Sequence, residues 1–307
     1  MKSVIVIIGP TCSGKTDISI QLAKKINSEI ISADSRQVYK YLTIGTAKPN
    51  AIQLNQIKHH FIDELYPDEY FNADLFSKRA NEIILHLFQK GKIPIVVGGS
   101  GLYIKALIDG LDIPVDSDPL LRKTLMEKRK QFGNEFIHNE LKKVDPVSSE
   151  KLLPQNWKRI IRALEVFYLT NQPIWRFESK MSAPRFNFIQ YGLLWDRKIL
   201  YERINSRVDK MFEEGLIDEV KNILSLGYDS NLNSLNTVGY KEVIDFLNGK
   251  ISSEKAIYLT KRNTRRFAKK QMTWFNKDKR IIWLDANSYS LSELAEQILK
   301  DFYERKD

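Results

Sequence analysis

The chain has 307 residues, of which 43% are hydrophobic, and it carries a formal net charge of +10. This length suits one large or two modest globular domains, and no apolar run approaches the roughly 18 residues that a membrane-spanning helix requires. The single cysteine, Cys12, excludes an internal disulfide and disfavours a zinc site built on thiolates, so we expect a cytoplasmic protein without a membrane partner.

The first 110 residues alternate short apolar runs with helical patterns. Buried strands are predicted at 3–8, 29–32 and 93–99, and helices at 14–26, at 72–90 and from about residue 101. Continuous apolar strands between helices are typical of a parallel sheet with helices on both faces, which predicts an α/β fold. The N-terminal apolar run leads into a glycine loop and not into a small-residue cleavage site, so it indicates a strand and not a signal peptide.

Residues 112–185 show a different pattern, with little that predicts a core strand. Helices are expected near 118–131, 134–143, 147–152 and 156–170, between two segments that contain proline. We therefore predict a helical insertion domain at 112–185 that interrupts a core formed by 1–111 and 186–307. Within the second part of the core, strands are expected at 186–195 and 280–284, with helices at 197–213 and 291–304 and a helix-rich stretch up to about 275.

The stretch GPTCSGKT fits the phosphate-binding pattern G-x4-G-K-[ST], and a predicted strand and helix flank it. Its backbone N–H groups, from residues 11–16, and the positive end of the following helix favour an anion. Lys15 should reach terminal phosphate oxygens, and the Thr16 hydroxyl should bind Mg²⁺. A glycine-rich turn without a ligand is the alternative. The predicted diphosphate-binding residues are Gly9, Pro10, Thr11, Cys12, Ser13, Gly14, Lys15 and Thr16.

Such a loop recognises a diphosphate and a metal, but it does not identify the rest of the ligand. A standard ATPase normally adds an aspartate at the end of a second buried strand. The strand predicted at 93–99 ends in two glycines instead, which argues against a standard ATPase.

Asp34 follows the strand predicted at 29–32, at the carboxyl edge where ligands bind in open α/β sheets. From this position alone, Asp34 could be a metal ligand, a general base or an ordinary turn-capping residue.

The window 261–280 contains nine Lys or Arg residues and one Asp, and it therefore carries most of the net charge. A local concentration of this kind is typical of a surface that binds a polyanion. A solvated basic helix face is the alternative.

Several segments together resemble the bacterial tRNA dimethylallyltransferases, and they occur in the family's order over nearly the whole chain. These segments are GPTCSGKT, ISADSRQVYKYLTIGTAKP, HHFID, VVGGSGLYIKAL, RALEVF, RINSRVDKM, GLIDEV, TVGYKEV and RRFAKKQMTWF. The resemblance implies a P-loop NTPase-like core and transfer of a dimethylallyl group from dimethylallyl diphosphate to N6 of the adenosine at tRNA position 37, next to the anticodon.

The resemblance also assigns catalytic roles. Asp34 would take the proton from the adenine amine, while Arg207, together with Thr16 and Mg²⁺, would stabilise the departing diphosphate. Without the resemblance, Arg207 would be interpreted as a surface residue of helix 197–213.

The partner implied is the anticodon stem-loop of tRNA. No obligate protein partner is predicted, and the sequence does not determine the oligomeric state, for which a monomer is the default expectation. Gln37 would read base edges, and Tyr240, Trp274 and Phe275 would either stack on bases or lie in the core. The insertion would clamp the RNA. The implied RNA-binding residues are Asp34, Ser35, Arg36, Gln37, Ser100, Arg122, Lys158, Arg159, Ile160, Ile161, Arg162, Asn236, Thr237, Val238, Gly239, Tyr240, Lys241, Lys269, Lys270, Gln271, Met272, Thr273, Trp274, Phe275 and Asn276.

Three rival functions fit parts of the sequence. A P-loop kinase for a small metabolite, with Asp34 as the base for its acceptor hydroxyl, explains the first 110 residues but leaves the basic window unexplained. A nucleic-acid-binding protein without catalysis would not need Lys15 and Thr16. A prenyltransferase that acts on free AMP would not need the basic window.

Overall fold

The computed structural model describes residues 2–110, 115–178 and 185–306. The chain divides into two compact units, Met1–Ile108 with Arg185–Asp307, here called the core unit, and Asp109–Pro184, here called the insertion unit. The boundaries expected at 112 and 185 lie beside these limits. The role of the insertion in RNA contact stays a prediction.

Six parallel strands form the sheet of the core unit, in the order β3-β2-β4-β1-β5-β6. Their bounds are β1 Ser3–Ile8, β2 Ile30–Ser32, β3 His59–His60, β4 Ile95–Gly98, β5 Asn187–Leu194 and β6 Ile282–Asp285. All five predicted strands are present. The sequence analysis missed β3, because two residues are too short to produce a recognisable apolar pattern.

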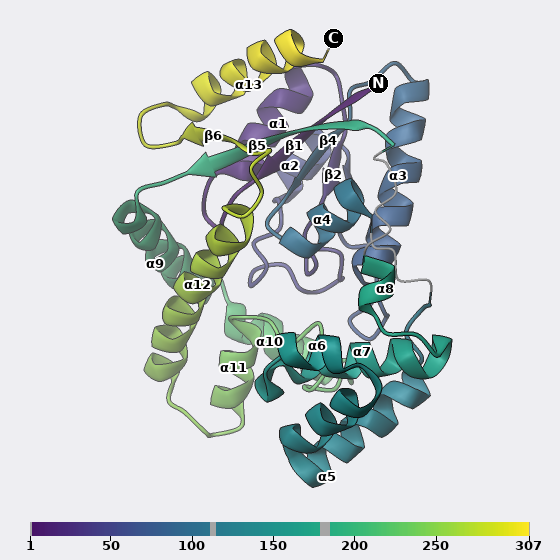
Figure 1. Ribbon diagram of the computed structural model, residues 1–307. Helices are drawn as coiled ribbons and strands as arrows, with labels where there is room; N and C mark the ends of the chain where they lie inside the picture. The colour runs from purple at the N-terminus through teal and green to yellow at the C-terminus, as the bar shows by residue number, and fades with distance from the viewer. Residues whose placement is uncertain (1, 111–114, 179–184, 307) are drawn as a thin grey trace. The chain divides into compact units, whose positions relative to one another are not determined.

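Helices cover both faces of this sheet. Successive side chains of β1 point to opposite faces, and those on both faces are therefore buried. Ile5 and Ile7 belong to a core cluster with side chains of α1 (Lys15–Lys25) and α13 (Leu291–Arg305). Figure 1 shows α13 beside α1, next to β6. Val4, Val6 and Ile8 are equally buried. The helices α3 (Ala73–Gln89) and α4 (Gly101–Asp109) are joined by a Phe76–Tyr103 ring stack and by a hydrogen bond from the Ser77 hydroxyl to the Ala106 carbonyl.

The rest of the core unit is helical, as expected. It contains α2 (Ala51–Gln56), which the sequence analysis missed, α9 (Arg197–Glu213), α10 (Leu216–Ser225), α11 (Tyr240–Leu247) and α12 (Ser253–Phe275). The two long helices α9 and α12 pack through Leu200, Ile204 and Ala268, and Cys12 of the phosphate loop contacts the same cluster. The phosphate loop is therefore packed, through Cys12, against the interface between α9 and α12.

The insertion unit contains only helices within its described residues. They are α5 (Pro119–Val144), α6 (Pro146–Lys151), a short 3-10 helix η1 (Pro154–Asn156), α7 (Trp157–Thr170) and α8 (Trp175–Glu178). Gly133 interrupts α5 with φ 88° and ψ 177°, where the sequence predicts a gap between two helices. Residues 111–114 and 179–184, which include parts of the predicted proline-containing flanks, lie outside the described residues.

Buried Glu165 of α7 is the polar centre of the insertion unit. Its carboxylate accepts hydrogen bonds from Arg122, Arg162, the Ser117 hydroxyl and the Asp118 backbone N–H, at 2.7–2.9 Å. A buried charge is tolerable only when it is paired and hydrogen-bonded in this way.

Within the ranges that the structure describes, no helix is both long and apolar enough to cross a lipid bilayer.

Replacing Glu165→Ala should destabilise the insertion unit by about 3 kcal/mol, because two arginines would lose their shared carboxylate. Hydrogen exchange of α5 and α7 amides should accelerate, while amides of the β1 and β4 strands keep their rates. Glu140→Ala, which removes only a surface pair with Lys143, is the control and should change neither set. Equal exchange rates in α7 of Glu165→Ala and the native protein would contradict the role assigned to Glu165.

Candidate active site at the carboxyl edge of the sheet

Three loops meet at the carboxyl edge of the sheet because β4 lies between β1 and β2. They are the phosphate loop after β1, the loop of Asp34 after β2 and the Gly99–Ser100 turn after β4. The backbone N–H of Ser35 donates to the Ser100 hydroxyl at 3.0 Å, and the Ser100 N–H donates to the Ala33 carbonyl at 3.3 Å. The structure therefore brings the predicted catalytic segments together, as expected for parallel strands that end side by side.

The two glycines that end β4 are explained by close approach of neighbouring groups. A Cβ atom on Gly98 would lie 2.1 Å from the Ala33 carbonyl oxygen, and one on Gly99 would lie 2.3 Å from the Gln271 amide nitrogen. Any larger residue, including the aspartate of a standard ATPase, would push these groups apart. The space beside these glycines is therefore filled by the backbone before Asp34 and by a side chain of α12.

Lys15 and Arg207 converge on the phosphate loop. The Lys15 ammonium donates to the Pro10 carbonyl at 2.6 Å, and Arg207 Nη1 lies 3.4 Å from both the Thr11 hydroxyl and the Cys12 sulfur. Lys15 keeps partial solvent exposure, yet desolvation of its ammonium, followed by repulsion from Arg207, lowers its pKa to about 8. Two cations that converge on one loop favour the binding of an anion such as a diphosphate.

Arg203 and Trp195 hold the outer side of the phosphate loop, and the sequence analysis assigned them no role. Arg203 Nε donates to the Cys12 carbonyl at 3.0 Å, and its guanidinium lies 4.3 Å from the Trp195 ring centroid. Trp195 Nε1 donates to the Ser13 carbonyl at 3.0 Å. The four-residue spacing of Arg203 and Arg207 on one helix could have pointed to a shared face.

Gln271 of α12 is the hydrogen-bond acceptor for one backbone N–H group of the phosphate loop. Its Oε1 accepts the backbone N–H of Thr11 at 2.9 Å. Among the N–H groups of residues 11–16 that were expected to favour an anion, that of Thr11 is therefore already used inside the protein, and the contact of the others with a diphosphate stays a prediction.

Asp34 has both a structural partner and an unused oxygen. Its Oδ1 accepts the backbone N–H groups of Arg36 at 2.8 Å and Gln37 at 3.3 Å, which is the capping arrangement considered from the sequence. Within the described residues no hydrogen bond occupies Oδ2. One oxygen fixes the side chain, and the other is available to a proton or a cation.

The loop after Asp34 is held by Glu219, which the sequence analysis did not single out. Its carboxylate accepts the N–H groups of Thr43, Ile44 and Gly45 at 2.7–3.3 Å and the Tyr240 hydroxyl at 2.6 Å. Burial, followed by the Glu219 charge, raises the Tyr240 pKa well above its usual value. No periodicity or motif spacing reveals such a long-range contact.

Gln37, expected to read base edges, is also committed to this loop. Its amide nitrogen donates to the carbonyls of Thr46 at 3.2 Å and Ala47 at 3.1 Å, and its Oε1 accepts the Ser32 hydroxyl at 3.3 Å. Both donor hydrogens of the amide are used, so readout by Gln37 would have to employ its oxygen or the neighbouring backbone.

Burial corrects the expectation of side-chain contact with RNA for several residues. Tyr240 is fully buried and Phe275 is 3% exposed, so these two rings are core residues and cannot stack on bases. The remaining buried members of the predicted set are Ile160, Ile161, Gly239 and Gln271. Trp274 is 38% exposed, so it keeps a surface that a base could contact.

The other predicted RNA-binding residues are exposed or partly exposed. In the core unit these are Asp34, Ser35, Arg36, Gln37, Ser100, Asn236, Thr237, Val238, Lys241, Lys269, Lys270, Met272, Thr273 and Asn276. In the insertion unit, Lys158 and Arg159 are exposed, whereas Arg122 and Arg162 are engaged with Glu165. Contact of these residues with RNA stays a prediction.

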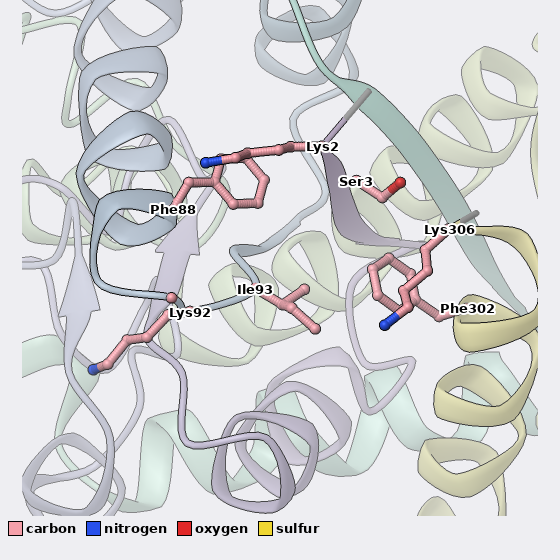
Figure 2. Close-up of a pocket in the computed structure, with 8 residues that line it drawn as sticks. Lys2, Ser3, Phe88, Lys92, Ile93, Phe302 and Lys306 are labelled. Atoms are coloured by element: carbon pink, nitrogen blue, oxygen red, sulfur yellow. The ribbon is translucent and has the colours of Figure 1, made fainter.

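A cavity of about 300 Å³ lies at the opposite, amino-terminal edge of the sheet (Figure 2). Lys2, Phe88, Lys92, Phe302 and Lys306 are among its lining residues. Lys92 pairs with Glu29 at 3.0 Å, and Lys2 lies over the Phe88 ring. This cavity contains none of the predicted site residues.

Over the described ranges, no group of three or more His, Cys, Asp or Glu side chains could hold a metal ion by itself.

A model of the family described as IPP transferase matches residues 37–278. A tRNA dimethylallyltransferase of Carboxydothermus hydrogenoformans is 46% identical over 304 residues, which cover 98% of this chain and 97% of the relative. This chain belongs to the IPP transferase family. A second family member with the same description, from Alkaliphilus oremlandii, is 47% identical over 304 residues and is covered to the same extents.

Solved structures agree with this assignment. The tRNA isopentenylpyrophosphate transferase of Bacillus halodurans is 37% identical and superposes with a TM-score of 0.74, covering 99% of this chain and 98% of that chain. A eukaryotic dimethylallyltransferase captured acting on tRNA gives a TM-score of 0.85 at 30% identity, covering 100% of this chain and 81% of that chain. The predicted family and the predicted P-loop NTPase-like α/β fold are confirmed.

Binding of pyrophosphate near pH 8 should take up a fraction of a proton through Lys15. The reason is that the lowered pKa leaves part of Lys15 neutral near this pH, and the anion raises that pKa again. Affinity should fall as the pH rises above 8. Calorimetry in buffers of different ionisation enthalpy measures the uptake. Lys15→Met is the control for protons that pyrophosphate itself exchanges on binding, and equal net uptake by both proteins would contradict the prediction.

Glu219→Ala should cost about 2–3 kcal/mol of local stability, because three backbone N–H groups and the Tyr240 hydroxyl lose their acceptor. Amides of residues 43–45 should exchange faster, as measured by hydrogen exchange and mass spectrometry. Tyr240→Phe removes only one of the four bonds and should cost about 1 kcal/mol. Unchanged protection of residues 43–45 in Glu219→Ala would exclude the proposed clamp.

Proposed function

We propose that this protein is a tRNA dimethylallyltransferase. It transfers the dimethylallyl group of dimethylallyl diphosphate to N6 of the adenosine at tRNA position 37, next to the anticodon, and releases diphosphate. The observation that carries the proposal is the meeting of the phosphate loop, Asp34 and the end of basic helix α12 at one edge of the sheet. The family relationship, which spans nearly the whole chain, supports it.

The diphosphate end of the donor would bind at the phosphate loop. Lys15 and Arg207 already face this loop, so they neutralise the charge that grows on the leaving oxygen without reorganisation during the reaction. Arg203, stacked on Trp195, fixes the loop from its other side. Breaking the C–O bond of the donor leaves the electron pair on this diphosphate oxygen.

Asp34 would act on the adenine amine, whose lone pair is delocalised into the ring and is therefore weakly nucleophilic. The free Oδ2 accepts an N6 hydrogen and takes the proton as the C–N bond forms. Its Oδ1 is held by two backbone N–H groups, which keeps the carboxylate oriented. One C–N bond forms, one C–O bond breaks, and the proton ends on Asp34.

Mg²⁺ fits the donor set as a metal shared with the substrate. The partly exposed Thr16 hydroxyl at the start of α1 makes no hydrogen bond within the described residues, and magnesium commonly uses one or two protein ligands beside phosphate oxygens. Bound there, the ion would supply further neutralisation of the diphosphate.

The anticodon stem-loop would contact the exposed basic residues of the core unit, including Lys241, Lys269 and Lys270, and the insertion unit would clamp it through Lys158 and Arg159. The target base is unpaired in the loop, so moving it out of its stack costs only a few kcal/mol. We further propose that the enzyme acts as a monomer in the cytoplasm, where its tRNA substrate is found.

Incubation with undermodified tRNA, Mg²⁺ and dimethylallyl diphosphate tests the proposal. Mass spectrometry of digested nucleosides should show a five-carbon group on adenosine. Phosphate transfer from ATP to a small metabolite, with no RNA retained at low ionic strength, would instead support the rival kinase.

Asp34→Asn should lower kcat at least about 100-fold, because the amide cannot accept the proton but can still accept the two backbone N–H groups. Single-turnover formation of prenylated adenosine measures the step. Retention of tRNA on filters is the control and should change less than twofold. If Asp34→Asn kept full activity, Asp34 could not be the general base.

A further inference from the structure

One buried side chain connects the phosphate loop to the basic helix. Gln271 is 7% exposed, its Oε1 accepts the Thr11 N–H at 2.9 Å, and its Nε2 donates to the Gly99 carbonyl at 3.0 Å. We propose that Gln271 is a positioning residue, which holds the phosphate loop and the end of β4 at a fixed distance from α12 and thereby sets the affinity for the diphosphate. This inference rests on the proposed function, because it concerns the same site.

The two hydrogen bonds of Gln271 determine the orientation of its amide. Thr11 offers a donor and Gly99 an acceptor, so only one arrangement of oxygen and nitrogen satisfies both. The missing Cβ of Gly99 leaves room for this nitrogen, since a Cβ would lie 2.3 Å from it. Both polar atoms of Gln271 are hydrogen-bonded inside the protein and its side chain is buried, which distinguishes it from its exposed neighbours.

The neighbours of Gln271 on α12 include residues that are predicted to contact RNA. Lys269 and Lys270 of the same turn are exposed, and Trp274, three residues further along, packs against Gly101. Gln271 and Trp274 therefore lie on one face of α12 against the turn after β4, while the lysines project to solvent. RNA bound to these lysines would restrain the helix turn that also holds Thr11.

The Thr11 amide has a second consequence for the donor site. Because its N–H points to Gln271, the loop presents its remaining donors and the Lys15 ammonium to an anion. Loss of the Gln271 oxygen would free the Thr11 N–H and let the loop change shape. Diphosphate affinity should respond, although Gln271 itself does not touch the diphosphate.

The test compares Gln271→Met with Gln190→Met. Gln190 of β5 is also a buried glutamine, 2% exposed, and its amide donates to Asp278 at 3.3 Å, so it controls for the loss of a buried amide. Calorimetry with magnesium pyrophosphate, without RNA, should show about three- to tenfold weaker binding for Gln271→Met, the range expected for the loss of one net hydrogen bond. Gln190→Met should bind within twofold of the native protein.

Steady-state kinetics supplies the second readout. In Gln271→Met the KM for dimethylallyl diphosphate should rise, while the KM for tRNA and filter retention of an anticodon stem-loop stay within twofold. Gly99→Ala, which displaces the Gln271 amide from the opposite side, should give the same pattern, and it decides the question if Gln271→Met does not fold.

Pyrophosphate binding within twofold of native in Gln271→Met and in Gly99→Ala would overturn the inference. So would a loss of RNA retention as large as the loss of pyrophosphate binding, because Gln271 would then be an RNA contact. If the native protein binds pyrophosphate and RNA but forms no prenylated adenosine, the proposed reaction fails, whereas the binding comparison still decides the role of Gln271.

Discussion

The position of β4 between β1 and β2 is the constraint on which the rest of the site depends. Parallel strands present their carboxyl ends at one edge, so this order sets the phosphate loop, Asp34 and Gly99 next to one another although 90 residues separate the first from the last. The approach is so close that β4 must end in glycine, because Gly98 lies against the Ala33 backbone and Gly99 against Gln271. Strand order thus brings the phosphate loop and Asp34 together and limits which residues can stand beside them.

Polar side chains that are buried (Glu165, Gln271) or half-buried (Glu219) then fix loops that the sheet alone would leave free. Glu219 holds residues 43–45, Gln271 holds Thr11 and Gly99, and Glu165 organises the insertion unit around two arginines. Each has its hydrogen-bonding atoms occupied, which makes burial of a carboxylate or an amide tolerable. Such groups specify one arrangement of a loop more strictly than apolar packing does, because a misplaced loop would leave them unsatisfied.

Electrostatics gives the site its preference for an anion. The Lys15 pKa is lowered to about 8 because its ammonium is desolvated and lies near Arg207, so the protonated form of Lys15 is held at a cost. An anion bound at the loop would reduce this cost. Under the proposed function, the same charges would stabilise the diphosphate leaving group without reorganisation during the reaction.

The sequence by itself determined the α/β class, five of the six strands, the long helices, the phosphate loop and the family, since these depend on local patterns and on ordered motifs. It also indicated the helical insertion, including the interruption of α5 near Gly133. The tertiary structure alone decided that Tyr240 and Phe275 are core residues, that Thr11 donates to Gln271, and that Glu219 and Arg203 support the site. Burial and hydrogen bonding of these side chains are set by residues up to 260 positions away, and no local pattern in the sequence records such contacts.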